Sequence, residues 1–241
     1  MIRLILKVSL LCVVLSSYSV SAKRARITDY PYVVSIRYDG AHICLGAIVS
    51  KNTVLSAASC VNLYVKAVDA LSKLTIHLGI DDEAENGLSY TVTSTVSQSS
   101  YTDPEEEKKD NADTIIVLLS EREFKTGRYA AVTPFSQSTV EYVRDATFFA
   151  VDGQRKLNVL KGGILENSVC LKSVPTMKIS KHQVCFIRPD DGEGCMSSSG
   201  SPVVHDGKLV AILPHGTSCT SVPVAAIHLA KFGSFIPYET S

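Results

Sequence analysis

The chain has 241 residues, and its 24 basic residues balance its 24 acidic ones, so the formal net charge is zero. The first 22 residues hold two basic residues and no acidic one, so without them 22 basic residues face 24 acidic ones, a net charge of −2. Neither binding to nucleic acid nor binding to an anionic membrane is favoured by this balance.

Residues 1–22 have the pattern of a secretory signal peptide. Arg3 and Lys7 precede an apolar run at 8–15, and small residues close the segment at 20–22. This pattern is typical of a leader that is removed on export. The apolar run is too short to span a bilayer and no later run approaches that length, so we expect a secreted, extracellular chain without a membrane anchor.

A basic tetrapeptide, residues 23–26, precedes the apolar Ile27. A protease that cuts after basic residues can recognise Arg26, so the segment has the form of a short propeptide. A solvated run of charge has the same appearance, and the residues alone leave both interpretations open.

Short β-branched and apolar segments make up most of the remaining chain, and their spacing is that of strands. Only residues 230–238 look helical, and the charged run at 103–110 is expected to be an exposed loop. Many short strands without helical crossovers indicate an all-β fold, either a sandwich or barrels. The 219 residues after the leader exceed one small barrel, so we expect two, at about 27–125 and 126–241. The expected strands are 32–36, 42–49, 53–57, 74–78, 89–96, 114–119, 146–151, 163–170, 183–187, 202–205, 208–213 and 222–229.

Six cysteines follow the leader, and in an oxidising compartment this number indicates three disulfides whose pairing the spacing leaves open. No Cys-x-x-Cys or His-x-x-x-His motif occurs, so no metal site is expected and no cofactor is indicated. The six are Cys44, Cys60, Cys170, Cys185, Cys195 and Cys219.

Residues 195–202, Cys-Met-Ser-Ser-Ser-Gly-Ser-Pro, have the pattern of a nucleophile loop. A serine flanked by small residues and followed by proline suits a tight turn that presents a hydroxyl to a substrate carbonyl. A serine-rich turn on an inert surface has the same pattern, so the rest of the chain must distinguish the two interpretations.

Five further motifs precede this loop in a fixed order: 26–27, 30–36 (Tyr-Pro-Tyr-Val-Val-Ser-Ile), 44–48 (Cys-Leu-Gly-Ala-Ile), 55–60 (Leu-Ser-Ala-Ala-Ser-Cys) and 111–113 (Asn-Ala-Asp). Together the series resembles the chymotrypsin/trypsin family of serine proteases over nearly the whole chain after the leader. The resemblance implies one protease domain at 27–241, built as two orthogonally packed six-stranded β-barrels with a short C-terminal helix. It also implies the disulfides Cys44–Cys60, Cys170–Cys185 and Cys195–Cys219.

The same resemblance implies a degenerate catalytic triad. The family uses a serine nucleophile, a histidine base and an aspartate that orients the histidine. Ser199 and Asp113 stand at the nucleophile and aspartate positions, but Ser59 stands where the histidine belongs. A hydroxyl neither takes up a proton near neutral pH nor reaches as far as an imidazole, so we expect no functional catalytic residue.

The activation switch of the family is also expected to be lost. In the family a carboxylate before the nucleophile pairs with the amino terminus that cleavage creates, and Ser198 stands at that position. Residues 27–30 read Ile-Thr-Asp-Tyr instead of Ile-Val-Gly-Gly, and the stretch before Pro31 is shorter. We therefore expect that a cut after Arg26 would not bring Ile27 to its pocket.

The specificity pocket differs from the family pattern as well. Pro214, His215 and Gly216 replace the Ser-Trp-Gly edge on which a peptide substrate forms strand pairing, and proline cannot donate. Val224 replaces a pocket glycine and is expected to narrow the pocket, with Glu193 at its floor.

His215 is the one histidine that the resemblance brings near the cleft as a substitute base. The other histidines are expected at strand ends or surface loops, with satisfied hydrogen bonds, namely His42, His77, His182, His205 and His228.

A retained scaffold with lost chemistry is typical of a binding protein derived from an enzyme. The sequence predicts a secreted, monomeric, catalytically inactive protease homologue with an extracellular protein partner, acting as a decoy or competitor in a protease cascade such as host complement. The short propeptide resembles gut-type trypsins and mite group 3 allergen-like inactive paralogues. A weak serine endopeptidase using Ser199 with a non-standard base, and a structural or storage protein, are the alternatives.

Overall fold

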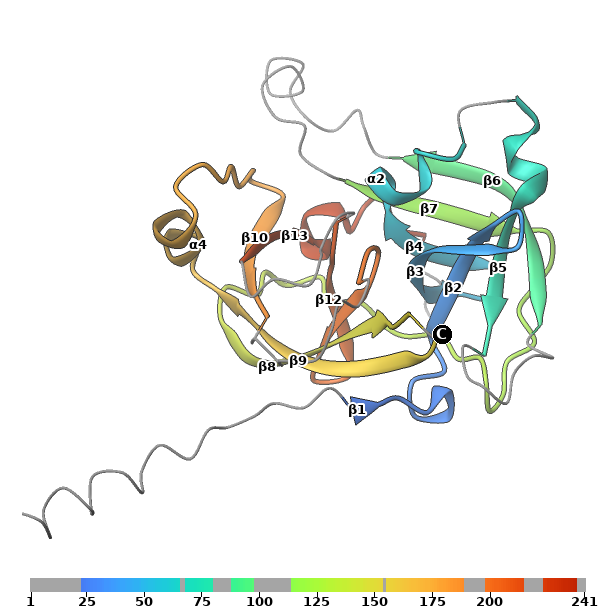
Figure 1. The fold of residues 1–241 in the computed structure, drawn as a ribbon, viewed down its shortest axis with the longest axis horizontal. Helices are drawn as coiled ribbons and strands as arrows, with labels where there is room; N and C mark the ends of the chain where they lie inside the picture. Colours follow the sequence, from blue (N-terminus) through green and yellow to red (C-terminus); the bar gives the residue numbers. More distant parts are fainter. Residues whose placement is uncertain are drawn as a thin grey trace, which may run out of the picture.

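The computed structural model describes residues 23–65, 68–79, 88–97, 114–153, 155–188, 198–214 and 223–237. Two antiparallel β-barrels of six strands each make up this part of the chain, and they lie side by side (Figure 1). The all-β, two-barrel fold expected from the sequence is therefore confirmed. No helix in these ranges is both long and apolar enough to cross a membrane.

The first barrel closes in the order β2-β3-β4-β7-β6-β5. Its alternating apolar residues explain the closure, since β5 buries Leu74, Ile76 and Leu78 and leaves the residues between them half-buried. The strands are β2 (Val33–Tyr38), β3 (Ala41–Ser50), β4 (Thr53–Ala57), β5 (Leu74–Leu78), β6 (Ser89–Ser97) and β7 (Ile115–Ser120), with α2 (Ala58–Val61) after β4 and the 3-10 helix η2 (Val68–Lys73) before β5.

The second barrel runs β9-β10-β13-β12-β11-β8 and closes through the pairing of β8 with β9. A seventh strand, β1 (Lys23–Arg24), pairs with the first half of β9, ahead of the residues that pair with β10. The 3-10 helix η1 (Ile27–Asp29) follows β1. The strands of the barrel are β8 (Val143–Val151), β9 (Leu157–Leu165), β10 (Gln183–Ile187), β11 (Pro202–His205), β12 (Lys208–Ile212) and β13 (Val224–His228).

Two expectations for local structure are wrong. The strand expected at 163–170 ends at Leu165, and the chain continues into α4 (Asn167–Ser173). The helix expected at 230–238 is a short 3-10 helix, η4 (Leu229–Phe232), followed by turns. Gly233 and Ser234 favour turns over helix, and Pro237 disfavours a helical conformation at the residue before it.

A buried apolar cluster joins the two barrels, and we call it the inter-barrel cluster. Neighbouring residues of one strand divide between this cluster and a barrel interior: on β8, Phe148 faces the core of the second barrel and Phe149 the inter-barrel cluster. Because both faces of β8 are covered over its last four residues, 148–151 are all buried and apolar. The members of the cluster are Ala25, Ile27, Val33, Leu45, Phe149, Val151 and Leu157.

Candidate functional site

The serine loop, residues 198–202, lies against both barrels and is held by its main chain. The Leu45 amide donates to the Ser199 carbonyl oxygen at 2.9 Å, and the Gly200 amide donates to the Leu213 carbonyl oxygen at 2.9 Å. Ser198 is fully buried and Ser199 is 6% exposed. The serine predicted to be the nucleophile is thus nearly buried, in a loop that main-chain hydrogen bonds hold in place.

Gly200 lets the serine loop approach β3 and β4 closely. Its φ is +73°, a conformation that favours glycine, and a Cβ here would lie 2.3 Å from the Leu45 carbonyl oxygen and 2.5 Å from Ser56 Oγ. That hydroxyl itself donates to the Leu45 oxygen at 2.7 Å. The loop therefore fits only with glycine at position 200.

Ser201 has a positioning role that sequence reasoning missed. Its Oγ accepts from the Phe149 amide at 2.8 Å and donates to the Pro202 carbonyl oxygen at 3.2 Å, and the residue is fully buried. A buried hydroxyl needs such partners, and the only sequence signal was a serine where the family has glycine. Ser201 ties the loop to β8 of the second barrel.

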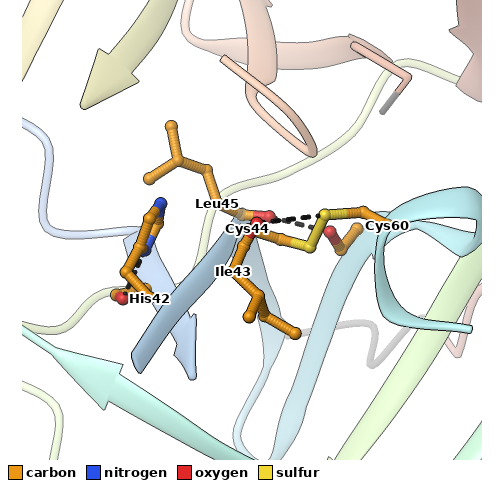
Figure 2. Close-up of a disulfide and its surroundings, with 7 residues drawn as sticks. His42, Ile43, Cys44, Leu45 and Cys60 are labelled. Carbon is orange, nitrogen blue, oxygen red and sulfur yellow. Dashed lines mark hydrogen bonds between the residues drawn. A yellow bond between two sulfur atoms is a disulfide. The ribbon is translucent and has the colours of Figure 1, made fainter. Parts of the chain in front are cut away.

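Ser59 lies on α2, directly before a disulfide that fixes this helix to β3. Figure 2 shows the bridge, Cys44–Cys60, which the resemblance implies. Cys44 precedes Leu45, whose amide holds Ser199. The half-buried Ser59 is therefore attached to the same strand as the serine loop, through one covalent and one hydrogen-bonded link.

The end of α2 that precedes Ser59 also contacts the segment after Asp113. The Ala58 amide donates to the Thr114 carbonyl oxygen at 2.7 Å. Asp113 itself lies outside the described residues, so its place as the aspartate of the triad stays a prediction.

The predicted specificity pocket is described only at two of its positions. Pro214 is half-buried after β12, and Val224 is half-buried at the start of β13, where it packs against the core of the second barrel. Glu193, His215 and Gly216 lie outside the described residues, as do Cys195 and Cys219. The narrowed pocket and the Cys195–Cys219 bridge therefore stay predictions, whereas the implied Cys170–Cys185 bridge is present between α4 and β10.

Two histidines near strand ends are neutral in the folded chain. His42 Nδ1 is 2.8 Å from Ser35 Oγ, and burial, followed by the charges of Arg37 and Arg155, lowers the pKa of His42 to about 4. His228 is 3% exposed and its Nε2 accepts from the Val140 amide at 3.2 Å. Burial, followed by Lys231, lowers the pKa of His228 to about 4.

We expect acid to destabilise the fold partly through His42. Its pKa is about 4 when folded and roughly 6.5 when unfolded. The unfolded chain therefore takes up the proton first, and stability is lost as pH falls from about 6.5 to 4. At pH 5 protonation of His42 in the unfolded chain should lower the free energy of unfolding by on the order of 2 kcal/mol.

Urea unfolding of wild type and His42→Gln at pH 7.5 and pH 5 measures this. The difference in unfolding free energy between the two pH values should shrink in the variant. Ser35→Ala serves as a control, because it removes the partner hydroxyl and keeps the imidazole, so it should retain most of the difference. An unchanged difference in His42→Gln contradicts the assignment.

Within the described ranges, no group of three or more His, Cys, Asp or Glu residues is placed to hold a metal ion. His205 ends β11 and pairs with Asp206 at 3.3 Å, and His182 precedes β10, as predicted, whereas His77 lies within β5.

The chain is similar to trypsins in sequence. It is 22% identical to a trypsin of Phaedon cochleariae over 227 residues, 90% of this chain and 86% of that protein. It is 24% identical to a vitellin-degrading protease of Bombyx mori over 211 residues, 80% of this chain and 74% of that protein.

Solved structures share the fold at low identity. Neuropsin from mouse brain has a TM-score of 0.71 at 18% identity, covering 89% of this chain and 96% of neuropsin. A scabies mite inactivated protease paralogue has a TM-score of 0.69 at 16% identity, covering 89% and 94%. Human heparin binding protein has a TM-score of 0.67 at 20% identity, covering 92% and 100%.

The sequence signature described as trypsin matches residues 19–236, which is most of the chain. With this match, two closed six-stranded barrels and a serine loop between them, the chain belongs to the trypsin family of serine proteases.

Proposed function

We propose that this chain is a secreted, catalytically inactive member of the trypsin family that acts by binding an extracellular protein. The observation that carries the proposal is Ser59, which stands on α2 where the family has its histidine base. Its hydroxyl has no basic site that titrates near neutral pH. Ser199 then stays protonated and weakly nucleophilic, and loss of one triad member costs on the order of 10⁶-fold in turnover.

The second observation in favour of the proposal is that the serine loop is held in place by hydrogen bonds although a charged residue expected beside it is missing. Main-chain bonds from Leu45 and to Leu213 hold the serine loop, and Gly200 keeps the one conformation that fits. Ser198, in contrast, replaces the carboxylate that in the family pairs with the new amino terminus and thereby orders the amides of the oxyanion hole, and a buried hydroxyl offers no charge to an amino terminus. An unchanged framework around an uncharged site favours binding over catalysis.

Two solved structures with this fold support the plausibility of such a role. One is described as an inactivated protease paralogue and another as a heparin binding protein. The fold therefore accommodates both inactivation and ligand binding. We take a protein partner for this chain because its charge after the leader is close to neutral, which does not favour a polyanion.

Secretion is supported by the leader pattern of residues 1–22 and by two disulfides, Cys44–Cys60 and Cys170–Cys185. Such bridges persist in oxidising compartments. In that setting an inactive homologue competes with active proteases for their substrates, activators or cofactors. We propose a monomeric decoy or competitor in a protease cascade, with host complement as the example to test.

Hydrolysis of a peptide ester tests the catalytic part of the proposal. We expect wild type and Ser59→His to show no turnover above the Ser199→Ala background. The restored imidazole is insufficient because Ser198 still lacks the carboxylate. Turnover by wild type that disappears in Ser199→Ala would establish the weak endopeptidase instead.

A cascade assay tests the binding part. Purified protein added to serum should reduce complement-mediated lysis or lengthen clotting in a saturable, dose-dependent manner. Ser199→Ala should act equally, because binding does not need the nucleophile. A reduction that requires Ser199 indicates proteolysis, and the absence of any saturable effect in both assays contradicts the cascade role and favours a structural or storage protein.

A further inference from the structure

Residues 23–30, which we call the amino-terminal clasp, are built into the second barrel. Lys23 pairs with Val159 and Arg24 with Asn158, so β1 extends the edge of β9 (Figure 1). The Ala25 amide continues the ladder by donating to the Leu157 carbonyl oxygen at 2.9 Å. The segment that has the form of a propeptide is therefore part of the folded sheet.

Apolar residues on both sides of Arg26 are buried. Ala25 is 3% exposed and Ile27 is 1% exposed, and both belong to the inter-barrel cluster. The chain then turns tightly, because the Asp29 amide donates to the Arg26 carbonyl oxygen at 2.9 Å and the Tyr30 amide to the Ile27 oxygen at 3.1 Å. Between these two buried residues the Arg26 side chain points outward, 78% exposed and paired with Asp29 at 3.2 Å.

The clasp supports the two residues that hold the serine loop. Leu45 and Phe149 pack in the same cluster as Ile27, and the ring of Tyr30 meets that of Phe149 edge-on at 5.0 Å. The Leu45 amide bonds the Ser199 oxygen, and the Phe149 amide bonds Ser201 Oγ. Packing around Ile27 is thereby connected to both ends of the loop through two hydrogen bonds.

We propose that the clasp orders the serine loop in the uncleaved chain, and that the Arg26–Ile27 bond is protected from proteases in the folded protein. A protease binds its substrate as an extended strand of several residues. Here the residues on either side of the bond are buried and the Arg26 carbonyl is hydrogen-bonded in a turn, so cleavage requires the clasp to open first. The ordering of the loop needs no charged amino terminus, which agrees with an uncharged Ser198.

Limited digestion with trypsin tests the protection. Mass spectrometry follows the bond after Arg26 in the folded, disulfide-bonded protein and in the same protein unfolded in urea. We expect cleavage to be at least about tenfold slower in the folded chain, since only the opened fraction is cut. Equal rates in the folded and unfolded chain overturn the proposal.

Two variants test whether the burial of Ile27 keeps the clasp closed, with an added carboxylate in each. Ile27→Asp buries an unpaired carboxylate in the cluster and should raise the cutting rate after Arg26 by at least about tenfold. Val132→Asp, at a position 45% exposed, is the matched control and should leave the rate unchanged. Similar rates in both variants and wild type contradict the role of Ile27.

Arg26→Gln tests whether cleavage after residue 26 is needed to order the serine loop. The variant removes the cutting site at an exposed side chain, so it should fold with an unchanged melting temperature. Hydrogen exchange at the Leu45 amide, which bonds Ser199, should be as slow as in wild type. Faster exchange in Arg26→Gln together with slow exchange in cleaved wild type would show that cleavage, and not the clasp, orders the loop.

Discussion

Replacing Gly200 with alanine should lower the free energy of unfolding by about 3 to 5 kcal/mol. The new Cβ would lie 2.3 Å from the Leu45 carbonyl oxygen and 2.5 Å from Ser56 Oγ, at a φ of +73°. Because these are a main-chain oxygen and a hydroxyl that bonds it, neither moves without breaking the contact between β3 and the serine loop. Urea unfolding followed by circular dichroism measures the effect.

Gly207→Ala is the matched control for this change. Gly207 has a similar φ of +71° in the turn between β11 and β12, but a Cβ there meets nothing within 4 Å. Its replacement should cost only the backbone strain, about 1 kcal/mol. The difference between the two variants isolates the steric clash at the loop, and equal losses would show that Gly200 is required only for its backbone conformation.

Replacing Phe149 with alanine should cost about 3 to 5 kcal/mol in unfolding free energy. The ring is fully buried in the inter-barrel cluster and has edge-on contacts with Tyr30 at 5.0 Å and Tyr32 at 6.1 Å. The cavity would lie between Ile27 and the strand that holds Ser201. We therefore expect both global destabilisation and local opening of the clasp.

Phe148→Ala is the control, since its neighbouring ring is equally buried but faces the core of the second barrel, 5.3 Å from Phe186. Both alanine variants should lose similar stability in thermal or urea unfolding. Under conditions where both stay folded, only Phe149→Ala should be cut faster after Arg26. If both variants, or neither, are cut faster, the clasp does not depend on the cluster in the way that the packing indicates.

The sequence pattern predicts most strands because apolar alternation is a local property. Residues 183–187 form a strand with those bounds, and the two barrels agree with the expectation from the length after the leader. Non-local contacts account for the errors. The Cys185 amide donates to Asn167 Oδ1 at 2.9 Å, which fixes the start of α4 against β10 where a continued strand was expected. No pattern within residues 163–170 shows that contact.

The sequence motifs indicate which residues form the candidate site, but not the hydrogen bonds and packing that hold those residues in place. The motifs assign Ser199 and Ser59 by order along the chain, and in the structure each lies on an element tied to β3. The hydroxyl of Ser201 and the buried Ile27 act through packing and hydrogen bonds to distant strands, which a linear motif does not reveal. Residues 23–26 likewise have the sequence of a propeptide, which does not indicate that Lys23 and Arg24 pair with β9.

The most direct test of the account is the rate at which a fluorophosphonate labels Ser199. Such a reagent needs a nucleophile activated by a base, and Ser59 supplies none. We predict labelling no faster than the Ser199→Ala background, on the order of 10⁶-fold below an active trypsin measured alongside. Labelling that mass spectrometry locates at Ser199, at a rate comparable to that of the active trypsin, would contradict the claim that this chain is an inactive protease.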